Sequence, residues 1–243
     1  MKITIDNNNL KETVDLYSEE GVELISKLWI KLCTEYRHTH ECSWMGMPII
    51  QLTNDIMMMQ ELIWQLKPDV IVECGVAHGG STVFYASLFE LMKTDGMVIG
   101  VDVDIREHNR KAIEAHSMSN RITLIEGSSV DLSIVEQVKA LIKNKTNVLV
   151  ILDSNHTTEH VFEELKLYSP MVQKNSYIVA MDGAQAWVAD IPSARPHWKE
   201  SHPLKAIELF LEQDKSFSID EKYTRLKVTA NPNGFLKRTK SAG

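Results

Sequence analysis

The segment from Glu73 to Ser81, with the sequence ECGVAHGGS, is the strongest local sign of a ligand site in this chain. It directly follows the apolar residues 70–72 and contains Gly75, Gly79 and Gly80. Such glycines permit a tight turn and close backbone approach, and the start of a helix offers free N–H groups to a polar ligand. The pattern predicts a ligand-binding loop between a strand and a helix. A purely structural turn is the alternative.

Two further polar strand ends follow in order along the chain. Asp102 ends the apolar run 97–101, and an acidic residue in that place can accept hydrogen bonds from both hydroxyls of a ribose. Its alternative role is to cap the next helix, for which Asp104 is better placed. Residues 126–131, with the sequence EGSSVD, carry small hydroxyl side chains that could contact the edge of an adenine. Together the three segments predict a nucleoside-binding site.

The spacing of the glycine loop distinguishes two nucleoside cofactors. A nicotinamide dinucleotide site favours Gly-x-Gly-x-x-Gly, which receives a pyrophosphate. Here three residues separate Gly75 from Gly79, and Glu73 stands at the strand end beside them. Its carboxylate would repel a pyrophosphate but could hold the amino group of a cofactor that ends in an amino acid. S-adenosylmethionine therefore fits this loop better.

An alternation of short apolar runs and amphipathic segments must position these loops. It predicts an α/β fold, a doubly wound Rossmann-like parallel sheet wrapped by helices. Strands are predicted at residues 70–72, 97–101, 122–125, 148–152 and 177–180, and helices at about 18–31 and 53–66. The strands are almost wholly apolar, as expected of strands buried on both faces. Two later runs, 216–219 and 226–229, predict an antiparallel ending of the same sheet.

The order and wording of several segments resemble class I S-adenosylmethionine-dependent methyltransferases. The chain is more closely similar to the cephalosporin hydroxylase family, a name that covers many methyltransferases of sugars and secondary metabolites. The matching segments are residues 46–51 (GMPIIQ), 73–81, 99–106 (IGVDVDIR), 121–131, 152–157 (LDSNHT) and 234–238 (GFLKR). The resemblance thus extends over about residues 42–238.

The resemblance implies a seven-stranded sheet and assigns cofactor-binding residues. Around the methionine part it places Glu73, Gly75, Gly79 and Ser81, and the further candidate cofactor-binding residues are Ala77, His78 and Asp153. Asp102 would hold the ribose, and Ser128, Ser129 and Asp131 would lie near the adenine.

Metal-dependent O-methyltransferases place one carboxylate after the fourth strand and one or two after the fifth. Asp153 and Asp182 occupy those positions in this chain and could coordinate Mg²⁺, which prefers oxygen ligands. Close relatives can have an acidic pair after the fifth strand, whereas Met181 precedes Asp182 here. His156 stands where a catechol-type methyltransferase has its general base, so it is the predicted catalytic residue together with Asp153. The alternative for both carboxylates is capping at strand ends.

The irregular stretch 182–203 follows the last central strand and is expected to contact the acceptor. Its candidate acceptor-binding residues are Gln185, Trp187, Arg195, His197 and Trp198. The predicted function is transfer of a methyl group to a hydroxyl of a sugar or a secondary metabolite.

Two other functions stay open. Asp153, His156 and His160 could form the facial triad of an iron hydroxylase. Met181 and the N-terminal helix instead suggest a cofactor-binding subunit without catalysis.

Composition excludes several other classes of protein. The chain has 243 residues, 44% of them apolar, and a net charge of −7, which argues against a generic nucleic-acid binder. Its N-terminus lacks a signal-peptide layout and no run approaches a membrane span, so we expect a cytoplasmic protein. The odd count of three cysteines predicts reduced thiols.

Residues 1–52 are expected to form an N-terminal helical extension and cap, and residues 53–243 the methyltransferase domain. The family resemblance favours a homo-oligomer.

Overall fold

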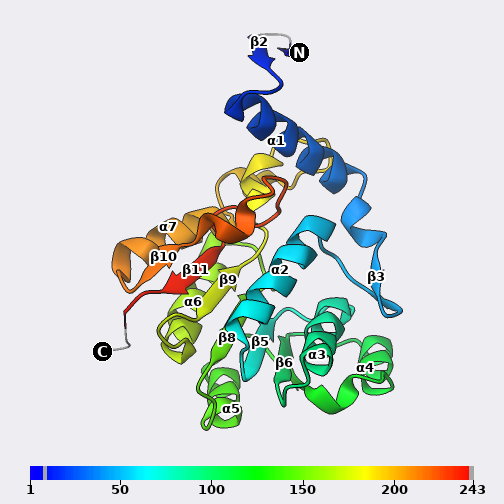
Figure 1. Ribbon diagram of the computed structural model, residues 1–243, viewed down its shortest axis with the longest axis vertical. Coiled ribbons are helices and arrows are strands. Elements are labelled where there is room, and N and C mark those ends of the chain that lie inside the picture. Colours follow the sequence, from blue (N-terminus) through cyan, green and yellow to red (C-terminus); the bar gives the residue numbers. More distant parts are fainter. Residues whose placement is uncertain (8–9, 241–243) are drawn as a thin grey trace.

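Seven strands form the central sheet of the computed structural model, which describes residues 1–7 and 10–240 (Figure 1). The strand order is β10-β11-β9-β8-β5-β6-β7. Their bounds are β5 (Val70–Cys74), β6 (Met97–Asp102), β7 (Ile122–Glu126), β8 (Val148–Leu152), β9 (Tyr177–Ala180), β10 (Phe217–Ile219) and β11 (Phe235–Arg238). The five predicted central strands are all present, and the prediction of a seven-stranded doubly wound sheet is confirmed.

The order of the strands reverses beside β5. This strand pairs in parallel with β6 on one side and with β8 on the other. The loops that follow β5 and β8 therefore leave the same edge of the sheet next to one another. In open parallel sheets this is the point at which ligands bind.

One strand prediction is wrong. The sheet does end in antiparallel strands, because β11 runs antiparallel to both β9 and β10. However, residues 226–229 do not form the last strand, which lies at Phe235–Arg238 instead. Lys227 has a left-handed φ of 66°, which interrupts an extended strand. The hydroxyl of Thr229 donates a hydrogen bond to Asp55, which holds this segment as a loop against α2.

Helices cover both faces of the sheet, and alternate residues of β5 face different layers. Val70, Val72 and Cys74 pack with α5, α6 and α7, whereas Ile71 packs with α2 and α3. The helices are α2 (Thr53–Leu66), α3 (Gly80–Met92), α4 (Glu107–Glu114), α5 (Leu132–Ile142), α6 (Thr158–Tyr168) and α7 (Pro203–Gln213). Burial on both faces explains why the central strands are almost wholly apolar.

The first 52 residues add two hairpins and a helix to the sheet. β1 (Lys2–Asn7) pairs with β2 (Leu10–Asp15), α1 (Glu19–Glu35) follows, and β3 (Ser43–Trp44) pairs with β4 (Met47–Pro48). Ser18 caps α1 by accepting a hydrogen bond from the N–H of Gly21. The N-terminal helix is present as predicted and ends four residues later, whereas the hairpin before it was not predicted. Figure 1 shows α1 and this hairpin at one end of the molecule, away from the sheet.

Two expectations about the whole chain can also be compared with the structure. None of the helices in the described ranges is both long and apolar enough to cross a membrane. Cys33, Cys42 and Cys74 carry free thiols, as the odd count predicted.

Candidate active site

Glycines allow three segments to meet at the edge of the sheet. Gly75 has a φ of 101°, and a Cβ atom there would lie 2.0 Å from the carbonyl oxygen of Asp153. A Cβ atom on Gly80 would lie 2.1 Å from the carbonyl oxygen of Pro48. The loop after β5 therefore contacts both the loop after β8 and the β3–β4 hairpin so closely that only glycine fits at these two positions.

A shallow hollow lies beside the glycine loop, over the carboxyl end of β6. Its lining residues are Ala77, His78, Asp102, Asp104, Arg106 and Asn109. Asp102 Oδ2 accepts hydrogen bonds from the N–H groups of Val76 and Ala77, at 2.8 and 2.9 Å. Asp102 therefore ties the loop to β6 and also lines the hollow. Three of the predicted cofactor residues, Ala77, His78 and Asp102, lie together here.

Glu73 lies away from this hollow, although its carboxylate was predicted to hold the cofactor's amino group. The side chain is fully buried, because β5 continues to Cys74 and the alternation of the strand turns Glu73 toward α3. Its Oε2 accepts a hydrogen bond from the hydroxyl of Thr82. Burial raises the pKa of Glu73 to about 7, and the hydroxyls of Ser81 and Thr82 offset part of that rise. This geometry places Glu73 inside the protein and not on the surface of the hollow.

The polar turn after β7 has partners within the protein. Asp131 accepts a hydrogen bond from the N–H of Ser133 at 2.8 Å and caps α5. The hydroxyl of Ser129 donates to buried Glu164 at 2.5 Å. Of the three residues predicted near the adenine, Ser128 is the one whose side chain makes no hydrogen bond within the described chain.

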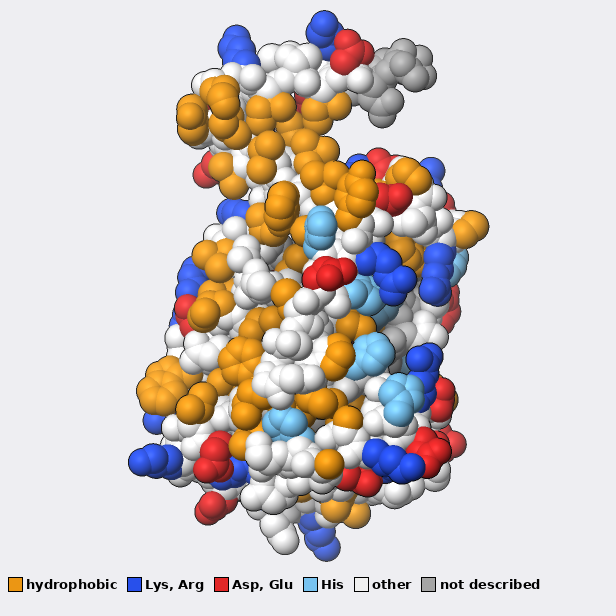
Figure 2. All heavy atoms as spheres, turned by 90° about the vertical axis from the view of Figure 1, so that its right-hand side faces the viewer, with side chains coloured by type: hydrophobic (Ala, Val, Ile, Leu, Met, Phe, Trp, Pro, Cys, Tyr) orange, Lys and Arg blue, Asp and Glu red, His pale blue; other side chains and the backbone are white. Residues whose placement is uncertain are grey.

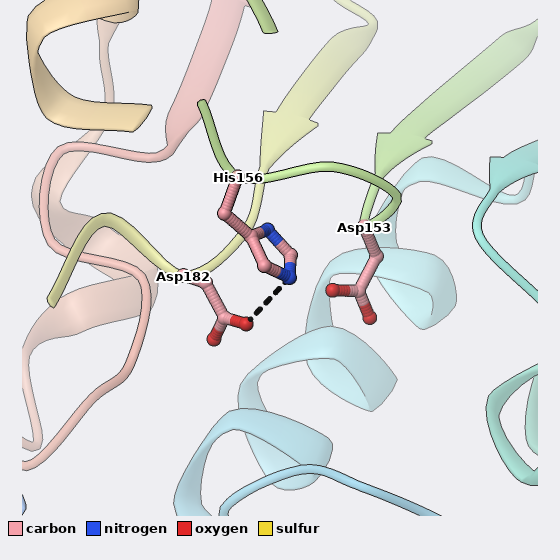
Figure 3. A group of neighbouring side chains, drawn as sticks. All are labelled: Asp153, His156 and Asp182. Carbon is pink, nitrogen blue, oxygen red and sulfur yellow. Dashed lines mark ion pairs between the residues drawn. The ribbon is translucent and has the colours of Figure 1, made fainter. Parts of the chain in front are cut away.

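Asp153, His156 and Asp182 converge at one place, as Figure 3 shows. One ligand-type atom from each lies within 4.8 Å of the other two. His156 Nε2 is 3.1 Å from Asp182 Oδ2. Because β8 and β9 are parallel neighbours, the residues that follow them leave the sheet side by side. Asp182 adopts a left-handed φ of 56°, and its N–H donates to Asn231 Oδ1 at 2.9 Å.

The electrostatics of this cluster favour a cation. Burial, followed by the negative charges of Asp182 and Glu73, raises the pKa of Asp153 well above its ordinary value. Gln51 Nε2 lies 3.5 Å from Asp153 Oδ2, and Gln51 Oε1 is buried with no hydrogen-bond partner in the described chain. Crowded carboxylates and an unpaired carbonyl oxygen are the groups that a hard divalent cation would satisfy.

The donor set therefore fits a divalent ion. It differs from a site made only of carboxylates, because Met181 precedes Asp182 where an acidic residue could stand. The side chain of Met181 is 3% exposed and packs in the apolar cluster of α2 and α3. It supplies no oxygen ligand. His156 is the third group at the place where the two carboxylates meet.

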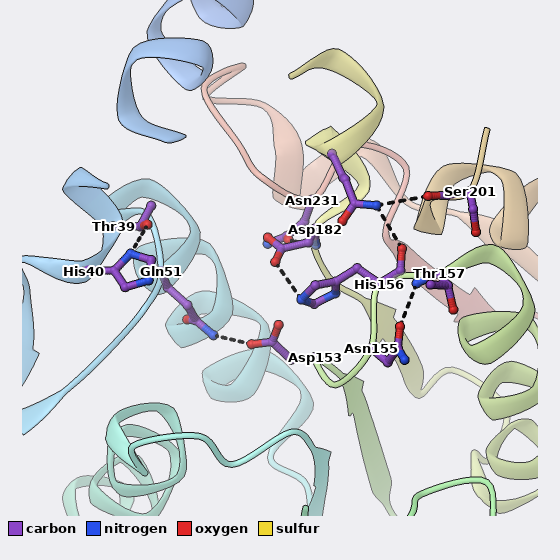
Figure 4. Close-up of polar contacts among 11 residues, drawn as sticks. Thr39, His40, Gln51, Asp153, Asn155, His156, Thr157, Asp182, Ser201 and Asn231 are labelled. Carbon is purple, nitrogen blue, oxygen red and sulfur yellow. Dashed lines mark hydrogen bonds and ion pairs between the residues drawn. The ribbon is translucent and has the colours of Figure 1, made fainter. Parts of the chain in front are cut away.

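The cluster opens into a cavity of about 200 Å³. Figure 4 shows polar side chains of its wall, among them Gln51, Asp153 and His156. The N-terminal 52 residues supply part of its wall, namely Ile30, Cys33, Thr34, Thr39, His40, Ile50, Gln51 and Leu52. The sequence predicted a cap formed by residues 1–52 but did not identify these individual residues, because no local pattern shows which of them face the cavity. Buried Asp55, whose pKa burial raises to about 7, lies in the same wall.

The predicted acceptor-binding residues divide into two groups. Gln185 and Trp198 line the cavity, and Gln185 Nε2 donates to the carbonyl oxygen of His156 at 3.1 Å. Gln185 thereby positions the loop that carries His156. Trp187, Arg195 and His197 lie outside the cavity lining.

The iron-triad alternative finds no matching geometry. His160 Nε2 lies 3.1 Å from the hydroxyl of Ser129 and 3.4 Å from Glu164 Oε1. It therefore contacts the turn after β7 and is absent from the cluster of Asp153, His156 and Asp182.

Known proteins are similar to this chain in sequence. Rhamnosyl O-methyltransferases of Mycobacterium bovis (strain BCG / Pasteur 1173P2) and Mycobacterium tuberculosis (strain ATCC 25618 / H37Rv) are each 29% identical to this chain over 201 residues. Each alignment covers 81% of this chain and 78% of the relative.

Solved structures show the same fold. One described as CmcI-N160 apo-structure superposes with a TM-score of 0.63 at 24% identity, over 83% of this chain and 78% of that one. Another, described as cmcI-D160 Mg-SAM, superposes with a TM-score of 0.61 at 21% identity over the same shares.

A family profile described as Rhamnosyl O-methyltransferase/CmcI matches residues 36–239, which is most of the chain. The match confirms the resemblance drawn from the sequence and, with the curated relatives, the prediction of an O-methyltransferase. The chain belongs to the Rhamnosyl O-methyltransferase/CmcI family.

Proposed function

We propose that this protein transfers the methyl group of S-adenosylmethionine to a hydroxyl of a sugar, with help from a divalent cation held by Asp153 and Asp182. The observation that carries the proposal is the convergence of Asp153, His156 and Asp182 on a cavity beside the glycine loop. S-adenosylmethionine supplies a methyl group on a positively charged sulfur. The protein's task is to deliver an oxygen nucleophile in line with it.

The site residues divide this task. The backbone of residues 75–81 and the carboxylate of Asp102 would hold the cofactor over the edge of the sheet. Asp153 and Asp182 would hold Mg²⁺, which lowers the pKa of a hydroxyl bound to it.

His156 Nε2 would accept the hydroxyl proton as the oxygen–carbon bond forms and the carbon–sulfur bond breaks. Asp182 lies 3.1 Å from that nitrogen and would stabilise the imidazolium that results.

The size of the cavity and the polar groups set in its largely apolar wall support a small acceptor that carries hydroxyls. Its volume of about 200 Å³ is below the roughly 300–1,000 Å³ of pockets for drug-sized ligands, so one sugar ring is an appropriate occupant. Gln51, Gln185 and Asn231 offer amide groups to hydroxyls, and Trp198 offers an apolar face. The curated relatives are named rhamnosyl O-methyltransferases, so a rhamnosyl residue is the first acceptor to test.

The test is transfer of a labelled methyl group from S-adenosylmethionine to a panel of rhamnosides and other glycosides, with Mg²⁺ or with a chelator. We expect a labelled methyl ether whose formation requires the metal and decreases in His156→Gln. Calorimetry with S-adenosylhomocysteine provides an independent measure of cofactor binding. Binding without transfer to any glycoside, phenol or other hydroxyl compound would favour the cofactor-binding subunit that Met181 suggested.

A further inference from the structure

The outer face of α1 carries a continuous row of exposed apolar side chains. Val22, Ile25, Trp29, Leu32 and Tyr36 are 43%, 41%, 52%, 48% and 67% exposed. Their spacing alternates between three and four residues, which is the repeat of a helix that packs along a second helix. We call this row the α1 seam. Figure 2 shows hydrophobic side chains gathered over this end of the molecule.

The neighbouring face of α1 already has its partner. Ser26, Ile30 and Cys33 are buried, and Ile30 and Cys33 pack with Leu52 and Val188 of the protein body. The protein body therefore covers only part of the apolar surface of α1 and leaves the α1 seam exposed.

The area of the α1 seam lies at the lower end of what a specific dimer buries. Five side chains that are about half exposed offer on the order of 100 Å² each, or roughly 500 Å² per copy. Pairing two copies would bury about 1,000 Å² in total, which reaches the lower limit of specific interfaces. Monomeric proteins rarely leave an apolar patch of more than a few hundred Å² uncovered.

The charges at the two ends of α1 select a direction of pairing. Glu19 and Glu20 lie in the first turn, and Arg37 and His38 follow directly after the helix. An antiparallel arrangement centred on Trp29 places the acidic end of one helix beside the basic end of the other. A parallel arrangement would place like charges together.

We propose that a second copy of this chain packs antiparallel on the α1 seam, with the two Trp29 side chains near the two-fold axis. A membrane surface fits the seam less well. Helices that lie on anionic membranes carry Lys and Arg on their polar face. α1 has four glutamates and two lysines, and the whole chain has a net charge of −7.

The dimer would also fix one wall of the candidate active site. Ile30, Cys33 and Thr34, on the inner side of α1, line the cavity above Asp153. Apart from its buried row, α1 contacts the protein body through side chains such as Lys31, whose Nζ is 2.5 Å from Asp190 Oδ2. A partner helix along the seam would hold this wall in place.

The experiment is sedimentation velocity and light scattering on the full chain at several micromolar concentrations. We expect a dimer for the unmodified protein and a dimer dissociation constant at least about tenfold weaker for Trp29→Glu. Trp64→Glu is the matched control, because Trp64 is 55% exposed on α2, outside the seam. Circular dichroism confirms that each variant is folded, and Ile25→Ser provides a milder disruption.

A charge exchange tests the direction of pairing. Arg37→Glu should weaken the dimer, and adding Glu20→Arg should restore it if the helices are antiparallel. A monomer at every concentration, or a dimer unaffected by Trp29→Glu, would overturn the proposal. So would flotation of the protein with phosphatidylserine vesicles through the seam, because the occupant would then be a lipid surface.

Discussion

Replacing Glu73 by Gln separates two roles for this residue. The sequence places Glu73 against the amino group of the cofactor, whereas the structure buries it against Thr82. Burial raises its pKa from 4.5 to about 7. At about 1.36 kcal/mol per pKa unit, the ionised carboxylate of the folded protein is destabilised by about 3 kcal/mol at high pH.

The sign of the pH dependence follows from proton binding. Between about pH 4.5 and pH 7 the folded state holds the proton of Glu73 while the unfolded state has lost it. This contribution to the free energy of unfolding is therefore largest below the unfolded pKa, falls as the pH rises to about 7, and is then constant. Between about pH 5.5 and pH 8 the loss is about 2 kcal/mol.

The assay is urea unfolding of the metal-free protein at these two pH values. From the lower to the higher pH, the free energy of unfolding of the unmodified protein should fall by about 2 kcal/mol more than that of Glu73→Gln. Glu114→Gln, in which an exposed carboxylate is removed, should leave the pH dependence unchanged.

Cofactor affinity decides between the two placements of Glu73. Because the side chain is fully buried away from the hollow, calorimetry should give Glu73→Gln a dissociation constant for S-adenosylhomocysteine within a few fold of the unmodified protein. A loss of tenfold or more in a variant of normal stability would show that Glu73 contacts the cofactor. An unchanged pH dependence would refute the assignment of its raised pKa.

Three further predictions concern the cavity. His156→Gln should lower kcat by roughly 10²–10⁴-fold in a methyl-transfer assay, whereas His197→Gln, outside the cavity, should leave kcat unchanged. Asp153→Asn should weaken Mn²⁺ binding, measured by the electron paramagnetic resonance of free Mn²⁺, because one of two carboxylates is lost; undiminished binding would place the ion elsewhere. Asp55→Asn should reduce the loss of stability between about pH 5 and pH 8 in urea unfolding, because burial raises the pKa of Asp55 to about 7.

The central sheet was predictable because its strands are buried on both faces. Residues 148–152 and 177–180 were identified with their observed bounds, since apolar runs of this length between amphipathic segments have few alternatives. The N-terminal hairpin was missed because its strands are rich in polar and charged residues and lack the apolar runs of the central sheet. Residues 226–229 look like a strand locally, but their contacts with Asp55 on α2 determine their path.

The metal and base candidates were easier to predict than the cofactor contacts. Asp153 and Asp182 follow parallel neighbouring strands, so their approach follows from topology alone. Glu73 shows the limit of this reasoning. Because β5 continues to Cys74, Glu73 lies within the strand and its side chain faces α3; had the strand ended at Val72, Glu73 would belong to the loop. The sequence does not specify the end of the strand to one residue.

On the proposed function, cofactor binding and choice of acceptor depend on different parts of the chain. The hollow beside the glycine loop is formed by residues 77–109, which lie within the family match of 36–239. The acceptor cavity takes eight of its nineteen lining residues from the first 52, and three of these eight lie on α1, before the match begins.

The family match therefore includes the whole lining of the hollow beside the glycine loop but not the whole lining of the cavity. Because the inner face of α1 shapes the cavity and its outer face carries the seam, the acceptor pocket and the proposed dimer depend on the same helix. On the proposed function, we expect a change in the sequence of α1 to alter the choice of acceptor while the cofactor site stays the same.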